Sequence, residues 1–264
     1  MPTNSLNEKG QQTTSGATNL SPADFPLGSP ESRAVARSWI EQIKKPSAHD
    51  KRQEELWRLI GQRVASFDGG ALLWLTRHTA TEDNHWMAKG TAPIAPFPRK
   101  DYFAVVLHYI LESPRIFIPK SREMMTSWLV CGYIAWMCQW FPYIEWILQT
   151  EKEDKAKELV NYCRILYQRQ DPWMQKRVHV TTDNVTELTL SNGSHILAVP
   201  KGANQVRLFH PYGYMMDEAA FLPEAQQCYD TVQPVAKQII AVSSAGPGWF
   251  GDQCGQANWG EVGQ

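Results

Sequence analysis

The segment from Glu112 to Tyr133 constrains the fold of this chain more than any other. Near its start, the apolar residues Ile116-Phe117-Ile118 are bounded by Pro114 and Pro119, a pattern that predicts a short buried strand. Next comes a compact polar turn, Lys120-Ser121-Arg122-Glu123, and after Thr126-Ser127 begins a long apolar stretch typical of a helix. A strand, a tight loop and a helix in this order place backbone N–H groups and a helix N-terminus where they can bind phosphate.

The usual phosphate-loop pattern, Gly-x-x-x-x-Gly-Lys-Ser/Thr, is only partly present. With Ser127 at the final hydroxyl position, Lys120 and Met125 stand where glycines are expected, and Thr126 stands at the usual lysine position. Glycine adopts left-handed backbone readily, whereas methionine adopts it only at a cost in free energy. By pattern alone, the segment is a weak phosphate loop.

A second apolar strand is predicted at residues 212–216, and two adjacent carboxylates follow it. An aspartate at the tip of such a strand can order the water shell of Mg²⁺ beside a loop hydroxyl, so Ser127 and Asp217 are candidate metal-site residues. Glu218 can polarise an attacking water as a general base. A strand ending in Asp-Glu is a moderate signal alone, and its pairing with the loop is far more specific.

A third predicted strand, residues 238–242, runs into small residues and a Gly-Pro-Gly turn. Small hydroxyls can hydrogen-bond a phosphate without filling the site. Ser243 and Ser244, with Ala245 after them, are therefore candidates for sensing the loss of a γ-phosphate. On its own, this pattern describes only a strand followed by a turn.

Taken in order, these motifs resemble the ATPase domain of tailed-phage terminase large subunits, the motors that pump DNA into capsids. The likeness covers about residues 95–250 and depends on KSREMMTSW, DEAAF and SSAGPG. In several branches of that family the loop lysine stands at the start of the loop, as Lys120 does. An arginine two residues later is a family feature, matched here by Arg122. The resemblance implies an ATP-phosphate loop made of Lys120, Ser121, Arg122, Glu123, Met124, Met125, Thr126 and Ser127.

The resemblance also implies an α/β fold of the P-loop NTPase class, RecA-like with an additional strand, whose mainly parallel sheet is flanked by helices. Together with composition, it divides the chain into three parts. These are a disordered tail at 1–30, a small N-terminal helical subdomain with an approach segment at 31–95, and an ATPase domain at 96–264.

Two further roles are considered on the same basis. In terminases the segment before the loop holds the nucleotide base, and Phe97, Arg99 and Tyr102 could stack on a ring. These three residues could equally pack a domain seam. Arg207 is a candidate sensor because the family often carries an arginine near this place, and a solvated arginine is the alternative.

The activity implied by the resemblance is Mg²⁺-dependent ATP hydrolysis, with Glu218 as catalytic base, coupled to translocation of double-stranded DNA into a procapsid. The implied partners are a portal protein, the terminase small subunit and further copies in a homo-oligomeric ring, in the cytoplasm of the infected bacterial host. Two alternatives stay open: another P-loop motor ATPase such as a helicase, and a degenerate nucleotide-binding or scaffolding module. The family's nuclease domain has no room after Phe250, so we expect no DNA cleavage by this chain.

Composition adds few limits. The net charge of -1 implies no general polyanion-binding surface, so any DNA contact must be local or shared among subunits. The five cysteines form no CxxC pair, which argues against a zinc site. Residues 127–143 lack charge and could be a membrane helix, but Gln139, Pro142 and the adjacent loop favour a buried helix.

Periodicity predicts further elements. Helices are expected at 31–45, 50–67, 101–112 and 151–168, and a hairpin is expected to turn at Asn192-Gly193. His78 and His85 have no recognisable metal spacing and are interpreted as surface or structural residues. In the second helix, five apolar residues fall on one broad face: Leu56, Trp57, Leu59, Ile60 and Val64.

Overall fold

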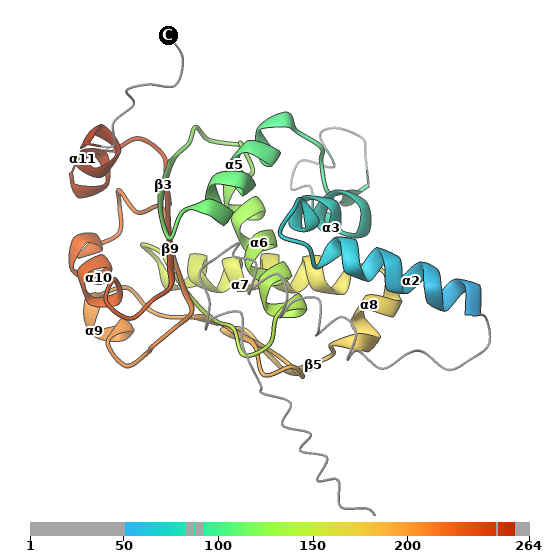
Figure 1. Ribbon diagram of the computed structural model, residues 1–264. Coiled ribbons are helices and arrows are strands. Elements are labelled where there is room, and N and C mark those ends of the chain that lie inside the picture. The colour runs from blue at the N-terminus through green and yellow to red at the C-terminus, as the bar shows by residue number, and fades with distance from the viewer. Residues whose placement is uncertain (1–50, 83–86, 88–91, 247, 257–264) are drawn as a thin grey trace, which may run out of the picture.

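The computed structural model describes residues 51–82, 87, 92–246 and 248–256 (Figure 1). The predicted tail at 1–30, the predicted helix at 31–45, His85 and residues 257–264 lie outside this part of the chain.

Seven strands form one sheet in the order β3-β9-β8-β4-β7-β6-β5. All pairs from β3 to β7 are parallel, and β7–β6 and β6–β5 are antiparallel, so the predicted mainly parallel sheet is confirmed. A separate antiparallel pair, β1 (Ala80–Glu82) with β2 (Ile94–Pro96), lies in the predicted approach segment. The sheet strands are β3 (Arg115–Pro119), β4 (Glu145–Gln149), β5 (Val180–Asn184), β6 (Glu187–Leu190), β7 (His195–Ala198), β8 (Gly213–Asp217) and β9 (Gln238–Ser243).

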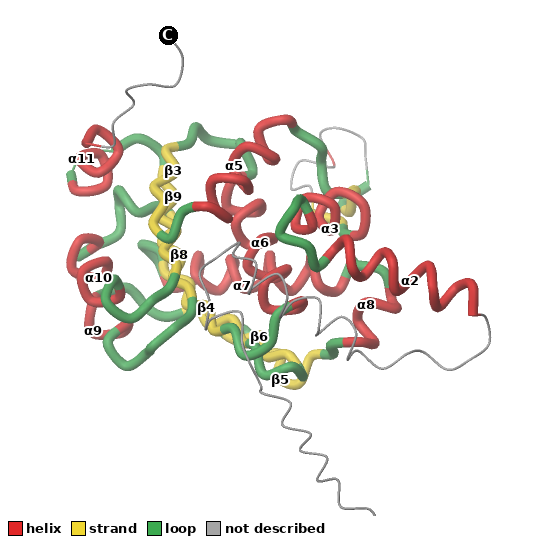
Figure 2. Tube along the Cα trace, viewed as in Figure 1, coloured by secondary structure: helices red, strands yellow, loops and turns green. Residues whose placement is uncertain are grey.

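Helices cover both faces of the sheet, which Figure 2 shows nearly edge-on. One face carries α3 (Gly70–His78), α5 (Asp101–Glu112), α6 (Thr126–Trp140) and α7 (Glu153–Gln168), with α2 (Lys51–Val64) and α8 (Pro172–Arg177) beside them. The other face carries α9 (Ala203–Val206), α10 (Ala225–Val232) and α11 (Trp249–Gln256).

The interiors of the central strands β4, β8 and β9 are mainly apolar, as expected where helices cover both faces of a sheet. Successive side chains of β9 point to opposite faces, so Ile240 and Val242 belong to the hydrophobic cluster of the first helix layer, and Ile239 and Ala241 belong to that of the second. The core therefore consists of two apolar layers separated by the sheet.

The uncharged stretch that begins at Ser127 is helix α6, as predicted, and it is buried on nearly all sides between the sheet and other helices. Its Trp136 donates a hydrogen bond from Nε1 to the carbonyl oxygen of Val64, 2.7 Å away. In the described part of the chain, no helix is long and apolar enough to cross a membrane.

The predicted hairpin is present between β6 and β7. Gly193 has a φ of 81°, the left-handed conformation that the turn requires and glycine supplies without strain. Asn192 donates from Nδ2 to the carbonyl oxygen of Cys138 at 2.8 Å. The turn therefore also fixes the C-terminal end of α6 against the sheet.

The predicted helix at 50–67 is α2, and its broad apolar face is only partly used. Trp57 stacks on Trp173 with ring centroids 6.1 Å apart, and Val64 is fully buried in the cluster that also contains α6. Leu56 and Leu59 are 55% and 46% exposed, so this part of the predicted apolar face is not buried in the core.

Gly213, the first residue of β8, gives a test of the packing. A Cβ at this position would lie 2.4 Å from ring carbons of Trp146 on β4. Because the overlap is with a fully buried ring, Gly213→Ala should lower the free energy of unfolding by roughly 1–3 kcal/mol. Gly255→Ala on α11 is the control, since among the described residues no atom beyond its chain neighbours and the nearby backbone of its own helix lies within 4 Å of the added Cβ. Equal urea midpoints for the two variants would contradict this packing.

Candidate functional site

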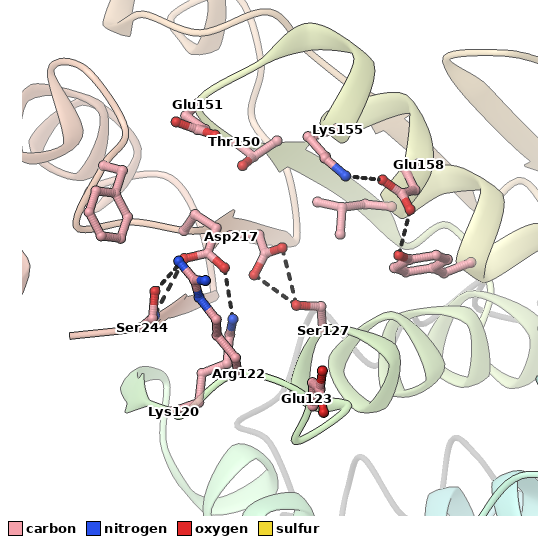
Figure 3. A pocket seen from close by; sticks show the side chains of 14 residues that line it. Lys120, Arg122, Glu123, Ser127, Thr150, Glu151, Lys155, Glu158, Asp217 and Ser244 are labelled. Atoms are coloured by element: carbon pink, nitrogen blue, oxygen red, sulfur yellow. Dashed lines mark hydrogen bonds and ion pairs between the residues drawn. The ribbon is translucent and has the colours of Figure 1, made fainter. Parts of the chain in front are cut away.

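A cavity of about 650 Å³ lies at the carboxyl ends of the parallel strands, where open α/β sheets bind their ligands. Its walls come from the loop after β3, from the tip of β4 with α7, from the tip of β8 and from the residue after β9 (Figure 3). The lining residues are Lys120, Arg122, Glu123, Ser127, Thr150, Glu151, Lys155, Glu158, Leu159, Tyr162, Asp217, Glu218, Phe221 and Ser244.

The loop from Lys120 to Met125 connects β3 to the N-terminus of α6. The N–H of Lys120 donates to the carbonyl oxygen of Ser243 at 2.9 Å, which continues the β3–β9 pairing into the loop. The hydroxyl of Tyr102 donates to the carbonyl oxygen of Met124 at 2.6 Å. Glu123 and Met125 have φ values of 64° and 54°. The loop thus adopts left-handed backbone at two positions without glycine, at a cost in free energy.

Ser127 and Asp217 form the first pair of polar groups in the cavity. The Ser127 hydroxyl, in the first turn of α6, donates to the Asp217 carboxylate with oxygen–oxygen distances of 2.9 and 3.1 Å. Burial raises the pKa of Asp217 to about 6, although the Ser127 hydrogen bond and Lys120 act to lower it. A hydroxyl and a carboxylate are oxygen ligands of the kind Mg²⁺ prefers, and a cation beside Asp217 would favour its charged form. The pair therefore fits a magnesium site.

Lys120 and Glu218 form the second pair. Lys120 Nζ lies 2.8 Å from Glu218 Oε1, and the Ser244 hydroxyl donates to Glu218 Oε2 at 3.1 Å. Burial raises the pKa of Glu218, but the bonds from Lys120 and Ser244 outweigh it and bring the pKa below its ordinary value. Glu218 becomes a stronger base when Lys120 turns to another anion, because the charge that lowers its pKa then moves away.

The tip of β9 lies on the same edge of the sheet as Lys120. Ser243 is fully buried, and its Oγ accepts a hydrogen bond from the N–H of Ala220 at 3.1 Å. Ser244 lines the cavity, and Ala245 is exposed just beyond it. Ser243 therefore fastens the segment after β8, while Ser244 contacts the cavity.

Of the predicted loop residues, Ser121, Met124, Met125 and Thr126 are not among those that line the cavity, and neither are four predicted residues outside the loop. Phe97 is 2% exposed and its ring centroid lies 5.6 Å from that of Phe103, so its role is core packing and it offers no free face to a base. Arg99 is exposed, and the Tyr102 hydroxyl donates its hydrogen bond to the carbonyl oxygen of Met124 in the loop. Arg207 is exposed at the end of α9, which agrees with the solvated alternative.

His78, interpreted from the sequence as a surface or structural residue, contacts an aspartate. Its Nδ1 lies 2.7 Å from Asp171 Oδ2, which links α3 to the start of α8. No group of three or more potential metal-ligating side chains occurs among the residues that the structure describes.

Half of the cavity was not predicted from the sequence. Thr150 and Glu151 follow β4 directly, and a face of α7 supplies the side chains beside them. The available signal was the change from the apolar residues of β4 to Gln149-Thr150-Glu151, which marks the carboxyl tip of a buried strand. Phe221, 48% exposed after β8, completes the wall.

No protein-family model matches this chain, and no curated protein is detectably similar to it. Among solved structures, the HK97 bacteriophage large terminase has a TM-score of 0.51 at 11% sequence identity. The ATPase domain of the large terminase from Thermus phage P74-26 has a TM-score of 0.43 at 14% identity and covers 65% of this chain and 72% of that domain. The large terminase of another thermophilic bacteriophage, in complex with ADP, has a TM-score of 0.43 at 13% identity, with 55% of this chain and 39% of that one covered.

The match to the HK97 protein covers 67% of this chain and 37% of the HK97 chain, so the chain spans little more than a third of that terminase. At 11% identity, the likeness concerns the fold alone, that is, the path of the backbone over the matched part of the two chains. This chain has the α/β fold of a phage large terminase.

Proposed function

We propose that the chain binds Mg²⁺-ATP in this cavity and hydrolyses it, as the ATPase part of a phage terminase large subunit. The observation that carries the proposal is the pairing of Ser127 with Asp217, 2.9 Å apart at the N-terminus of α6. The second pair, Lys120 with Glu218, lies in the same cavity. Together they supply a metal site, a cation for phosphate and a candidate base.

Phosphate recognition is assigned to the loop. Lys120 and Arg122 line the cavity and can form charge-assisted hydrogen bonds with phosphate oxygens. The N-terminus of α6 adds backbone N–H groups and the positive end of the helix dipole. Because Lys120 is bound to Glu218, a phosphate competes for it with that carboxylate.

Metal binding is assigned to Ser127 and Asp217. When bound there, Mg²⁺ neutralises charge on the phosphates. The chain's own contribution is a carboxylate held beside a hydroxyl, in a setting that disfavours its ionisation without a cation.

Glu218 is assigned the role of general base. Release from Lys120 returns its pKa toward or above the ordinary value, so that it can accept the proton of an attacking water. The hydrogen bond from Ser244 keeps the carboxylate in place while Lys120 is engaged elsewhere. Ser244 thereby connects the base to β9, the strand whose tip carries the candidate γ-phosphate sensors.

The assembly is proposed on the order of the motifs and on the fold. ATP hydrolysis would drive double-stranded DNA into a procapsid, in a homo-oligomeric ring that contacts a portal protein and the terminase small subunit in the host cytoplasm. A net charge of -1 favours a DNA contact that is local or shared among the copies.

One specific observation favours a second candidate, a nucleotide-binding or scaffolding module without turnover. The loop has non-glycine residues at φ 64° and φ 54°, and such strain opposes the ordered loop that turnover requires. Measurements of ATP binding and of turnover, made on the unaltered chain and on variants of Lys120 and Glu218, separate the two functions.

Lys120→Ala and Glu218→Gln should fail in different ways. Loss of the Lys120 ammonium removes charge-assisted bonds and should weaken ATP binding by roughly 10–100-fold. The Glu218→Gln side chain cannot accept the proton, so turnover should fall by about 10²–10⁴-fold without any loss of ATP affinity, because the amide competes less with phosphate for Lys120. Calorimetric ATP titration and a phosphate-release assay measure the two quantities.

The control is Lys176→Ala, which removes an exposed lysine on α8 outside the cavity lining and should leave both quantities unchanged. ATP binding without any turnover by the unaltered chain would favour the module. Equal turnover by the unaltered chain and Glu218→Gln would remove Glu218 as the base.

Asp217→Asn should stabilise the nucleotide-free protein at pH 8. The pKa of Asp217 is about 6 in the folded protein and 3.8 ordinarily, so folding favours the protonated acid. The resulting loss of stability is complete above about pH 6, amounts to at most about 3 kcal/mol, and vanishes below about pH 4. The amide removes it and still accepts the Ser127 hydrogen bond.

Thermal unfolding at pH 8 and pH 4, with and without Mg²⁺, measures this effect. We expect a higher midpoint for Asp217→Asn at pH 8 alone, and stabilisation by Mg²⁺ only in the unaltered chain. A variant less stable than the unaltered chain at pH 8 would show that ionised Asp217 is not disfavoured by its burial.

A further inference from the structure

The wall of the cavity formed by α7 has no role in the function proposed above. Its lining residues are Lys155, Glu158, Leu159 and Tyr162, which lie at positions i, i+3, i+4 and i+7 of the helix and so share one face. Figure 3 shows Lys155 across the cavity from the loop, with Asp217 and Ser127 between the two walls. A cation therefore stands on each side of the candidate metal site.

Lys155 is held in place by a chain of contacts that leads to the first turn of α6. Its Nζ lies 2.8 Å from Glu158 Oε2, and the Tyr162 hydroxyl donates to the other oxygen of Glu158, also at 2.8 Å. The Tyr162 ring stacks on Trp128 with centroids 4.1 Å apart and an interplanar angle of 19°. Trp128 follows Ser127 in the sequence, so the ammonium is positioned relative to the candidate metal site.

The ion pair that holds Lys155 is weak enough to exchange its acceptor. The lysine side chain is 61% exposed and that of Glu158 is 35% exposed, and exposed pairs contribute at most about 1 kcal/mol to stability. A phosphate oxygen, with more negative charge and several acceptor positions, is a stronger partner for an ammonium group. Glu158 would retain its hydrogen bond from Tyr162 after such an exchange.

The charge of Lys155 is secured by its surroundings. The hydrogen bond and the charge of Glu158 raise the pKa of Lys155, and Asp217 and Glu151 add smaller effects in the same direction. Asp217, the carboxylate of the candidate metal site, thus has a small electrostatic effect on the Lys155 ammonium.

The lining of the cavity leaves one cation without a phosphate assigned to it. Lys120 and Arg122 both come from the loop, which binds the phosphates from one side. The carboxylates of the lining outnumber its cations, so a triphosphate needs every positive charge available. The carboxylates are Glu123, Glu151, Glu158, Asp217 and Glu218, and the cations are Lys120, Arg122 and Lys155.

We propose that Lys155 binds the terminal phosphate of a nucleoside triphosphate from the wall opposite the loop, within the same chain, and so distinguishes a triphosphate from a diphosphate. The inference rests on the proposed function and deepens it. The loop cations contact the phosphates that both nucleotides share. Lys155 would contact only the group that hydrolysis removes, so ADP would return it to Glu158.

Calorimetric titration of the full chain tests this assignment, with Mg²⁺ and either ADP or the non-hydrolysable ATP analogue AMP-PNP. Lys155→Met should weaken AMP-PNP binding roughly tenfold, as expected for loss of one charge-assisted hydrogen bond, and change ADP affinity less than about twofold. Lys155→Arg should restore most of the difference. Lys157→Met is the matched control, because Lys157 lies on the same helix, pairs with Glu153 and does not line the cavity.

The outcomes separate this inference from the function on which it rests. Equal weakening of AMP-PNP and ADP by Lys155→Met, or no weakening of either, would overturn the role of Lys155 while nucleotide binding stands. No binding of either nucleotide by the unaltered chain would overturn both. If Lys157→Met lost as much AMP-PNP affinity as Lys155→Met, the loss would be explained by the lower positive charge of α7 as a whole. That result would also refute the assignment.

Discussion

The position of β9 between β3 and β8 is the constraint on which the rest of the site depends. Adjacent strands are about 4.8 Å apart, so β3 and β8, the strand that ends in Asp217, are separated by roughly 10 Å. That separation leaves room for a ligand between the two tips, and the ion pair between Lys120 and Glu218 spans it. It also places Ser244 beside Glu218, to which the Ser244 hydroxyl donates a hydrogen bond. The position of β9 between β3 and β8 thus determines the width of the cavity and brings Ser244 into its lining.

The charged groups at this edge are balanced against one another rather than individually stabilised. Asp217 is ionised at neutral pH against the effect of its burial, while Glu218 depends on Lys120 for its low pKa. Glu218 also has a φ of 50°, which brings left-handed backbone to the strand tip. Such an arrangement lowers the stability of the empty protein and makes the site responsive, since a ligand that takes up Lys120 changes the surroundings of both carboxylates.

The sequence could predict the elements whose signals are local, and it could not predict what strand order brings together. The loop after β3, the Asp-Glu pair after β8 and the small hydroxyls after β9 each follow an apolar strand, so their place at one sheet edge was foreseeable. Thr150 and Lys155 were missed because only the pairing of β4 with β8 places them beside Asp217. Phe97 shows a different limit: the sequence left its ring open to a stacking role or a packing role, and its burial in the core favours the packing role.

The edge position of β3 has a consequence for how copies of this chain can meet. Within the described residues, β3 pairs with β9 alone, so its other side presents backbone groups that could accept a further strand. The Lys120 N–H points to β9, and successive N–H groups alternate in direction, so the missing N–H of Pro119 belongs to the open side. A strand of five residues that starts after Pro114 and ends in Pro119 is a poor template for β-augmentation. A second copy of this chain that approached this edge would therefore contact it through side chains rather than through a shared sheet.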